Sequence, residues 1–113
     1  MFLSIIIPVY NEENTIIQIL KKVNDQKKNL NIEIIISDDG STDQTKNLIK
    51  ENNYLYDKLI INEKNMGKGH AIKKALKLIE GDVILIQDAD LEYDPEDYEK
   101  LLSPIRQGIS NVV

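Results

Sequence analysis

Two aspartates, Asp88 and Asp90, follow an apolar run at residues 83–86 with one alanine between them. Side chains at positions i and i+2 of an extended chain point the same way, so both carboxylates can face one point. Paired carboxylates suit a hard cation such as Mg²⁺ or Mn²⁺, especially one that is shared with substrate phosphates. A solvated acidic loop would contain the same residues, but the position directly after an apolar strand favours a metal site.

Two adjacent acids, Asp38 and Asp39, follow another apolar run and precede Gly40. Aspartate is common before a glycine turn, so a turn explains either residue alone. Together they also allow a second role, in which a carboxylate accepts N–H bonds from a nucleobase. Pro8 and Tyr10 follow the first apolar run, and they either pack against such a base or simply end a strand.

One lysine, Lys68, lies between two glycines where a helix is expected to begin. Its amine and the backbone N–H groups of the helix start could bind phosphate, although a solvated lysine explains the position equally well. His70 is the only histidine, and a place on the helix surface suits it better than catalysis. The acids from Glu92 onward are best explained as first-turn residues of a later helix, with Glu92 the one placed to reach a metal.

The apolar periodicity predicts four strand–helix units that position these residues. The expected strands cover residues 3–7, 32–37, 58–62 and 82–87, and residues 109–113 look like the start of a fifth. This spacing is typical of βαβ units in an α/β fold, a parallel sheet with helices on both faces. Ligands of such sheets bind outside the carboxyl ends of the strands. The acids therefore share one edge with the segment after the first strand.

Several residues are predicted to begin or end the helices. Asn11 is a candidate N-cap of the first helix, and Ser41 with Gln44 has the spacing of a capping box. Gly81 is a natural stop for the third helix, and Asp94 is a candidate N-cap of the fourth.

Composition and charge exclude several classes of protein. The 113 residues have a formal net charge of −5, which argues against a nucleic-acid partner. There is no cysteine, so disulfides and thiolate metal sites are excluded. No apolar run approaches the roughly 20 residues that span a bilayer, and the first residues do not form a signal peptide. We expect a cytoplasmic protein, with peripheral attachment to the cytoplasmic membrane face also allowed.

Four segments in order resemble the family 2 inverting glycosyltransferases of GT-A fold. They are "SIIIPVYNEENTI", "EIIISDDGSTDQT", "NMGKGHAIKKAL" and "GDVILIQDADLEYDPEDYEKLL", and together they cover nearly the whole chain. Within the family, the chain is most similar to dolichyl- and polyprenyl-phosphate sugar synthases of the dolichyl-phosphate mannose synthase kind. The implied fold is a Rossmann-like nucleotide-binding half with a mostly parallel sheet.

The resemblance also implies roles for individual residues. Asp39 would hydrogen-bond the base, and Asp88 and Asp90 would hold the metal and diphosphate. Glu92 stands where the relatives often have Gln, as a third candidate metal ligand. The implied nucleotide-binding residues are Pro8, Tyr10, Glu12, Asp38, Asp39 and Ala89.

The implied reaction is inverting transfer of a sugar from a nucleotide-diphosphate donor, of the GDP-mannose or UDP-glucose type, to a polyprenyl or dolichyl phosphate. A divalent cation at Asp88 and Asp90 would neutralise the leaving diphosphate. Family members continue with an acceptor-binding half, so we expect residues 1–113 to form a single donor-binding half-domain that transfers no sugar alone. An exposed edge or apolar face could also drive self-association.

Two other functions remain open on the sequence. A haloacid-dehalogenase-type phosphohydrolase also has D-x-D after an apolar strand, but normally after the first strand and with Thr or Val where this chain has Glu92. A nucleotide-binding module without turnover has the same donor-side residues. The sequence does not distinguish uracil from guanine as the base.

Overall fold

A computed structural model of the chain describes residues 1–90, 94–98 and 100–102 and has a four-stranded sheet at its centre. The strands are β1 (Leu3–Val9), β2 (Ile32–Asp38), β3 (Lys58–Ile61) and β4 (Val83–Ile86). They lie in the order β3-β2-β1-β4, and every neighbouring pair is parallel. The predicted α/β fold with a parallel sheet is therefore confirmed.

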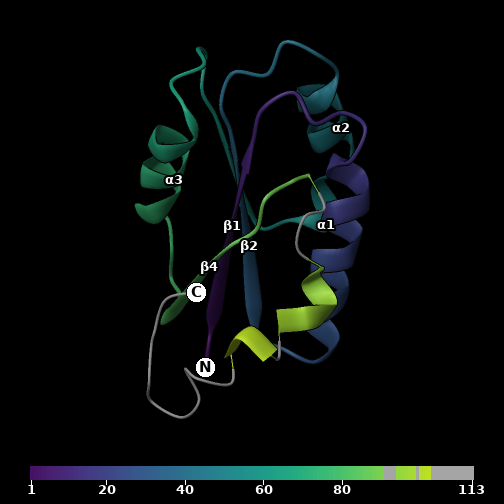
Figure 1. The fold of residues 1–113 in the computed structure, drawn as a ribbon, viewed down its shortest axis with the longest axis vertical. Helices are drawn as coiled ribbons and strands as arrows, with labels where there is room; N and C mark the ends of the chain where they lie inside the picture. Colours follow the sequence, from purple (N-terminus) through teal and green to yellow (C-terminus); the bar gives the residue numbers. More distant parts are fainter. Residues whose placement is uncertain (91–93, 99, 103–113) are drawn as a thin grey trace.

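Helices cover both faces of this sheet (Figure 1). The helices α1 (Ile16–Asp25) and α2 (Thr45–Glu51) lie on one face, and α3 (Lys68–Leu76) lies on the other. Short 3₁₀ turns follow α1 and α2 at Gln26–Lys28 and Asn53–Leu55, and a third occupies Pro95–Asp97. Among the described residues, no helix is both long and apolar enough to cross a membrane.

The two central strands carry the core because both of their faces are covered. Every residue of β1 and β2 is buried. Alternation along β1 sends Ile5 and Ile7 to the large cluster under α1 and α2, and Ile6 to the smaller cluster under α3. Ala75 of α3 packs in that smaller cluster, and its short side chain lets the helix lie close to the sheet.

The first two predicted caps are wrong. The helix α1 begins at Ile16, and Asn11 lies upstream of it in a left-handed conformation with φ 50°. Its side chain is used elsewhere, because its Oδ1 accepts the Thr42 N–H at 2.8 Å. No capping box forms either, since α2 begins at Thr45 and the hydroxyl of Ser41 donates to Asp38 instead. Both side chains bond to other parts of the carboxyl edge rather than to a helix start.

Of the two predictions for the later helices, one is confirmed and one is wrong. Asp94 is an N-cap as predicted, because its carboxylate accepts the Glu96 N–H at 3.0 Å. Gly81 does not end α3, which stops at Leu76. A Cβ on Gly81 would stand 2.5 Å from the Ser4 hydroxyl, so the glycine is needed for close packing. The predicted fifth strand lies outside the described residues.

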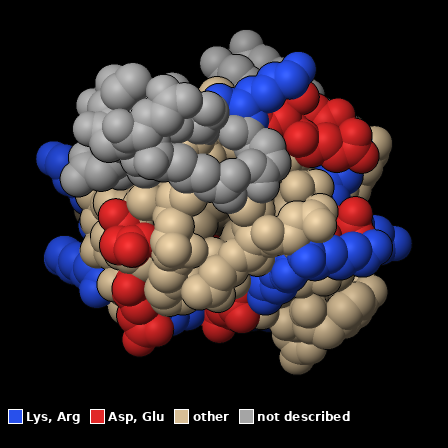
Figure 2. Space-filling view, turned by 90° about the horizontal axis from the view of Figure 1, so that it is seen from below, with Lys and Arg blue, Asp and Glu red and all other residues tan. Residues whose placement is uncertain are grey.

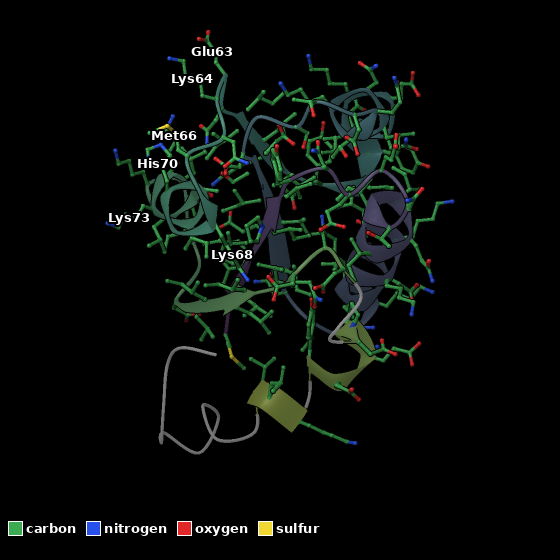
Figure 3. The ribbon with its side chains drawn as sticks, turned by 45° about the horizontal axis from the view of Figure 1, so that its top comes forward. Glu63, Lys64, Met66, Lys68, His70 and Lys73 are labelled. Atoms are coloured by element: carbon green, nitrogen blue, oxygen red, sulfur yellow. The ribbon has the colours of Figure 1, made fainter. Side chains whose placement is uncertain are left out.

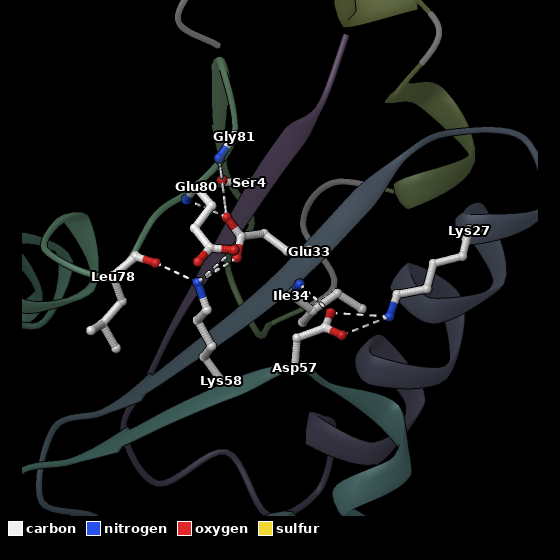
Figure 4. A network of polar contacts seen from close by, with 9 residues as sticks. All are labelled: Ser4, Lys27, Glu33, Ile34, Asp57, Lys58, Leu78, Glu80 and Gly81. Carbon is white, nitrogen blue, oxygen red and sulfur yellow. Dashed lines mark hydrogen bonds and ion pairs between the residues drawn. The ribbon is translucent and has the colours of Figure 1, made fainter.

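A buried carboxylate braces the amino end of the sheet (Figure 4). Glu33 accepts the Ser4 hydroxyl at 2.5 Å and the Glu80 N–H at 2.6 Å, and it pairs with the Lys58 amine at 2.9 Å. Burial alone raises the pKa of Glu33, but the hydrogen bonds from Lys58, Ser4 and the Glu80 N–H outweigh it and hold the pKa below its ordinary value. These bonds join β2 to β1, to β3 and to the turn that leads into β4.

Candidate functional site

A cavity of about 390 Å³ opens where β1, β2 and β4 end. Figure 2 shows the opposite end from below, where acidic and basic side chains both occur around a centre of other residues. The residues lining the cavity include all the described candidate site residues except Asp38, and Glu92 lies outside the described residues. The lining residues are Pro8, Val9, Tyr10, Glu12, Asp39, Lys68, Ala71, Asp88, Ala89 and Asp90.

Hydrogen bonds from the loop after β1 hold the β1 side of the cavity. The Asn11 N–H donates to the Ser41 hydroxyl at 2.9 Å, and the Glu12 N–H donates to the Thr45 hydroxyl at 2.9 Å. The loop after β1 is thus fixed to the loop after β2 and to the first residue of α2. Tyr10 lies between these anchors and the strand, and the residue is still 41% exposed. An aromatic ring held at a cavity wall offers a flat apolar surface to a planar ligand.

The adjacent acids Asp38 and Asp39 have different positions. Asp38 is fully buried, and its carboxylate accepts the Ser41 N–H at 3.1 Å and the Ser41 hydroxyl at 2.5 Å. It does not line the cavity. Its contacts hold the turn from which Asp39 reaches the cavity.

The carboxylate of Asp39 anchors the loop that precedes α3. It accepts the Gly67 N–H at 2.7 Å and the Met66 N–H at 3.0 Å, and it is only 3% exposed. The loop lies so close that a Cβ on Gly40, whose φ is +80°, would stand 2.6 Å from the Lys64 carbonyl carbon. Each carboxylate oxygen can accept more than one hydrogen bond, so Asp39 keeps capacity for a ligand N–H.

A second set of contacts positions the segment after β4. The Thr15 hydroxyl, at the start of α1, donates to the Ala89 carbonyl at 2.6 Å. The Gln87 side-chain amide donates to the Asp88 carbonyl at 3.1 Å. Neither Thr15 nor Gln87 was predicted as a site residue, and the one available signal was a polar glutamine at the end of an apolar strand. These contacts fix the backbone between the two candidate metal ligands.

Tyr98 stands behind Gln87 and is fully buried. Its hydroxyl donates to the Gln87 side-chain oxygen at 2.7 Å. Burial, and secondarily the nearby charge of Asp94, raises the pKa of Tyr98, so the hydroxyl keeps its proton. This contact could not be predicted, because a tyrosine that only fills the core and a tyrosine that holds a neighbouring side chain look the same in a sequence.

The amine of Lys68 pairs with the carboxylate of Asp88 across the cavity. Figure 3 shows Lys68 turned from the start of α3 toward the sheet, while Lys64 and Lys73 point outward. His70 lies on the outer side of α3, which agrees with its predicted surface position. Both residues line the cavity, so a hydrogen-bonded cation and anion lie within the candidate site.

The described residues fit a metal that takes part of its coordination from a ligand. They contain no group of three or more His, Cys, Asp or Glu side chains that could hold a metal ion by themselves. Asp88 and Asp90 both line the cavity and offer two carboxylates. Mg²⁺ is commonly held by one or two carboxylates together with substrate phosphates and water. The site therefore suits a cation that arrives with a phosphate ligand.

Comparison with known proteins identifies relatives of this chain. The family model described as Glycosyl transferase family 2 matches residues 4–113. A dolichol-phosphate mannosyltransferase of Pyrococcus furiosus is 35% identical over 96% of this chain and 31% of its own length. An undecaprenyl-phosphate 4-deoxy-4-formamido-L-arabinose transferase of Pseudomonas fluorescens is 34% identical over 96% of this chain and 34% of its own length. The chain thus spans about a third of these relatives.

Solved structures also share the fold. Residues 1–349 of TarS from S. aureus, in complex with UDP, superpose with a TM-score of 0.77 at 29% identity, covering 95% of this chain and 32% of that one. Glucosyl-3-phosphoglycerate synthase of Mycobacterium tuberculosis, in complex with Mn²⁺, UDP and glucosyl-3-phosphoglycerate, gives a TM-score of 0.76 at 26% identity, covering 92% of this chain and 39% of that one.

Proposed function

Because the chain belongs to glycosyl transferase family 2, we propose that the cavity at the carboxyl edge of its sheet binds the nucleotide diphosphate of an activated sugar. One observation carries the proposal: a single cavity brings together an aromatic ring, a buried carboxylate and an acidic pair that is joined to a lysine. These groups come from four separate segments of the chain. The aromatic ring and the buried carboxylate suit a nucleobase, and the acidic pair with the lysine suits a diphosphate and its cation.

The base end of the proposed site is formed by Pro8, Tyr10 and Asp39. The exposed ring of Tyr10 offers a face for the base, and the anchored carboxylate of Asp39 can accept a base N–H. Two structural neighbours were solved with UDP, which supports a uridine nucleotide as the first ligand to test.

The diphosphate end is formed by Asp88, Ala89, Asp90 and Lys68. Asp88 and Asp90 would hold Mg²⁺ or Mn²⁺, and a neighbouring structure that contains both Mn²⁺ and UDP supports this role. Such a cation, when bound, would offset the charge that develops on the leaving diphosphate. Lys68 contributes a positive charge of its own, and Thr15 holds the backbone of Ala89 in place.

The acceptor in the whole protein is proposed to be a lipid phosphate, because two relatives are named for dolichol phosphate and undecaprenyl phosphate. A phosphate oxygen already carries negative charge, so it can attack the anomeric carbon without a general base. Attack opposite the leaving diphosphate inverts that carbon. We expect residues 1–113 to bind the donor, and positioning of both substrates to need more of the fold. Such an acceptor would place the protein at a membrane surface. Self-association of the chain stays a prediction.

Two assays on the purified chain test the proposal. Calorimetry with UDP and with GDP, each with and without Mn²⁺, should show metal-dependent binding of one of them. A radiolabelled transfer assay with UDP-glucose, GDP-mannose and polyprenyl phosphate should show no lipid product. Absence of binding to either nucleotide contradicts the donor-site proposal. Metal-dependent lipid product contradicts only the expectation that these residues do not complete the acceptor site.

A further inference from the structure

We propose that Lys68 is a built-in counter-ion of Asp88, which a divalent cation must displace and whose freed amine then pairs with the diphosphate of the donor. This inference rests on the proposed function, since it assigns a cation and a diphosphate to the same cavity. It adds a competition between Lys68 and the cation for Asp88, which is relieved when the diphosphate offers the lysine another partner. The starting observation is that Lys68 occupies the carboxylate that a cation would use.

Secondary-structure elements and their hydrogen bonds position Lys68 and Asp88 relative to each other. Lys68 is the first residue of α3, and Asp88 follows the end of β4. The backbone before the lysine is fixed, because the Gly67 N–H donates to Asp39 at 2.7 Å. The Asp88 backbone is held through the Gln87 side chain. The approach of the amine is therefore set by the fold rather than by a free surface loop.

The exposure of the two side chains suits an exchangeable contact. The Lys68 side chain is 56% exposed, whereas the Asp88 side chain is 26% exposed. The carboxylate thus belongs to the cavity wall, and the amine enters from the solvent side. A lysine stem has four rotatable bonds, so the amine can move to a new partner while its backbone stays in place.

The charges of the cavity make such an exchange necessary for an anionic ligand. Its lining residues include four carboxylates, those of Glu12, Asp39, Asp88 and Asp90, and one amine, that of Lys68. A diphosphate that enters this lining meets like charge, which is repulsive at short range. A divalent cation bound to Asp88 would turn this repulsion into attraction. It would also occupy the carboxylate with which Lys68 had paired.

This competition links the two ligands thermodynamically. Without nucleotide, a cation must break the Lys68–Asp88 pair, which lowers its affinity. With a diphosphate present, the amine has another anionic partner, so that cost falls. Linkage is reciprocal, so the cation must raise the nucleotide affinity by the same factor. Since partly exposed ion pairs are worth little, we expect the effect of Lys68 to be about two- to fivefold in the affinity for the cation.

The chain offers matched controls for the loss of one positive charge. Lys64 and Lys73 flank Lys68 on the same loop and helix, but Figure 3 shows both pointing outward. Lys73→Met changes the net charge by the same amount as Lys68→Met and leaves the pair intact. Lys68→Arg keeps a cation beside Asp88. A difference between Lys68→Met and Lys73→Met therefore reports the ion pair and not the overall field.

The test is calorimetric titration of the parent chain and these variants with Mn²⁺, without nucleotide and then with UDP. We expect Lys68→Met to bind Mn²⁺ about two- to fivefold more tightly than the parent without nucleotide, to bind UDP more weakly without metal, and to show a smaller coupling between the two. Lys73→Met and Lys68→Arg should resemble the parent. Lys68→Gln serves as a second neutral variant, and thermal unfolding confirms that each variant is folded.

Two results would overturn the inference and are distinguishable from each other. If Lys68→Met and Lys68→Gln bind Mn²⁺ no more tightly than Lys73→Met, while UDP and Mn²⁺ still bind together, only the counter-ion role is wrong. If no variant and no parent chain binds Mn²⁺ even with UDP, the metal part of the proposed function is wrong as well.

Discussion

Replacement of Asp39 by alanine separates two roles that the structure gives to one carboxylate. Asp39 accepts the backbone N–H groups of Met66 and Gly67 at 3.0 and 2.7 Å, so the change frees the loop that precedes Lys68. Hydrogen bonds to a charged group are worth about 1.5–3 kcal/mol each, but both amides can be rehydrated, so we expect a loss of about 2–4 kcal/mol in the free energy of unfolding. Denaturant unfolding measures this loss.

The role in base binding predicts a further and selective loss. A contact between Asp39 and a base N–H of about 1.5–3 kcal/mol corresponds to a tenfold to hundredfold weaker binding of UDP. Pyrophosphate has no base and provides the matched ligand. If Asp39 binds the base, Asp39→Ala weakens UDP far more than pyrophosphate in calorimetry with Mn²⁺. An equal loss for both ligands would refute this reasoning and leave Asp39 as a loop anchor that acts through Lys68.

Two further predictions concern contacts away from the ligand. Tyr98→Phe removes the hydroxyl that donates to Gln87, and it should lower the free energy of unfolding by about 1–2 kcal/mol in denaturant titration; an unchanged midpoint would contradict the bracing role. The pKa of Glu33 in the folded chain is held below its ordinary value of 4.5, so as the pH falls Glu33 takes up a proton first in the unfolded chain. The contribution of Glu33 to the free energy of unfolding is therefore present above pH 4.5 and is lost as the pH falls below it. Thermal unfolding between about pH 3 and 6 should show this slope in the parent chain, and Glu33→Gln should flatten it.

The strands and the location of the site could be predicted because they depend on local patterns. Apolar runs of β-branched residues define buried strands, and polar residues directly after them must share the carboxyl edge of a parallel sheet. Those two facts predicted that Tyr10, Asp39, Asp88 and Asp90 share one edge of the sheet, and the structure shows that all four line one cavity there. The location of the site therefore followed from the order of strand ends along the chain.

The roles that depend on distant partners could not be predicted. Asn11 and Ser41 have the residue types of helix caps, but Asn11 bonds to the loop after β2 about thirty positions away, and the Ser41 hydroxyl donates to Asp38 and accepts the Asn11 N–H. Asp38 and Asp39 are equivalent in the sequence, and only the structure shows that one holds a turn while the other lines the cavity. Thr15 donates to a carbonyl 74 positions away, for which no local pattern exists.

The central claim is that Asp88 and Asp90 couple a divalent cation to a nucleotide diphosphate in this cavity. The most direct measurement is the affinity for UDP with and without Mn²⁺, in the parent chain and in Asp90→Asn. Asp82→Asn is the matched control, since it removes the same charge just before β4, at the other end of the strand. We predict that Mn²⁺ tightens UDP binding in the parent chain and in Asp82→Asn, and that the effect collapses in Asp90→Asn. An equal effect of Mn²⁺ in all three chains would contradict the account.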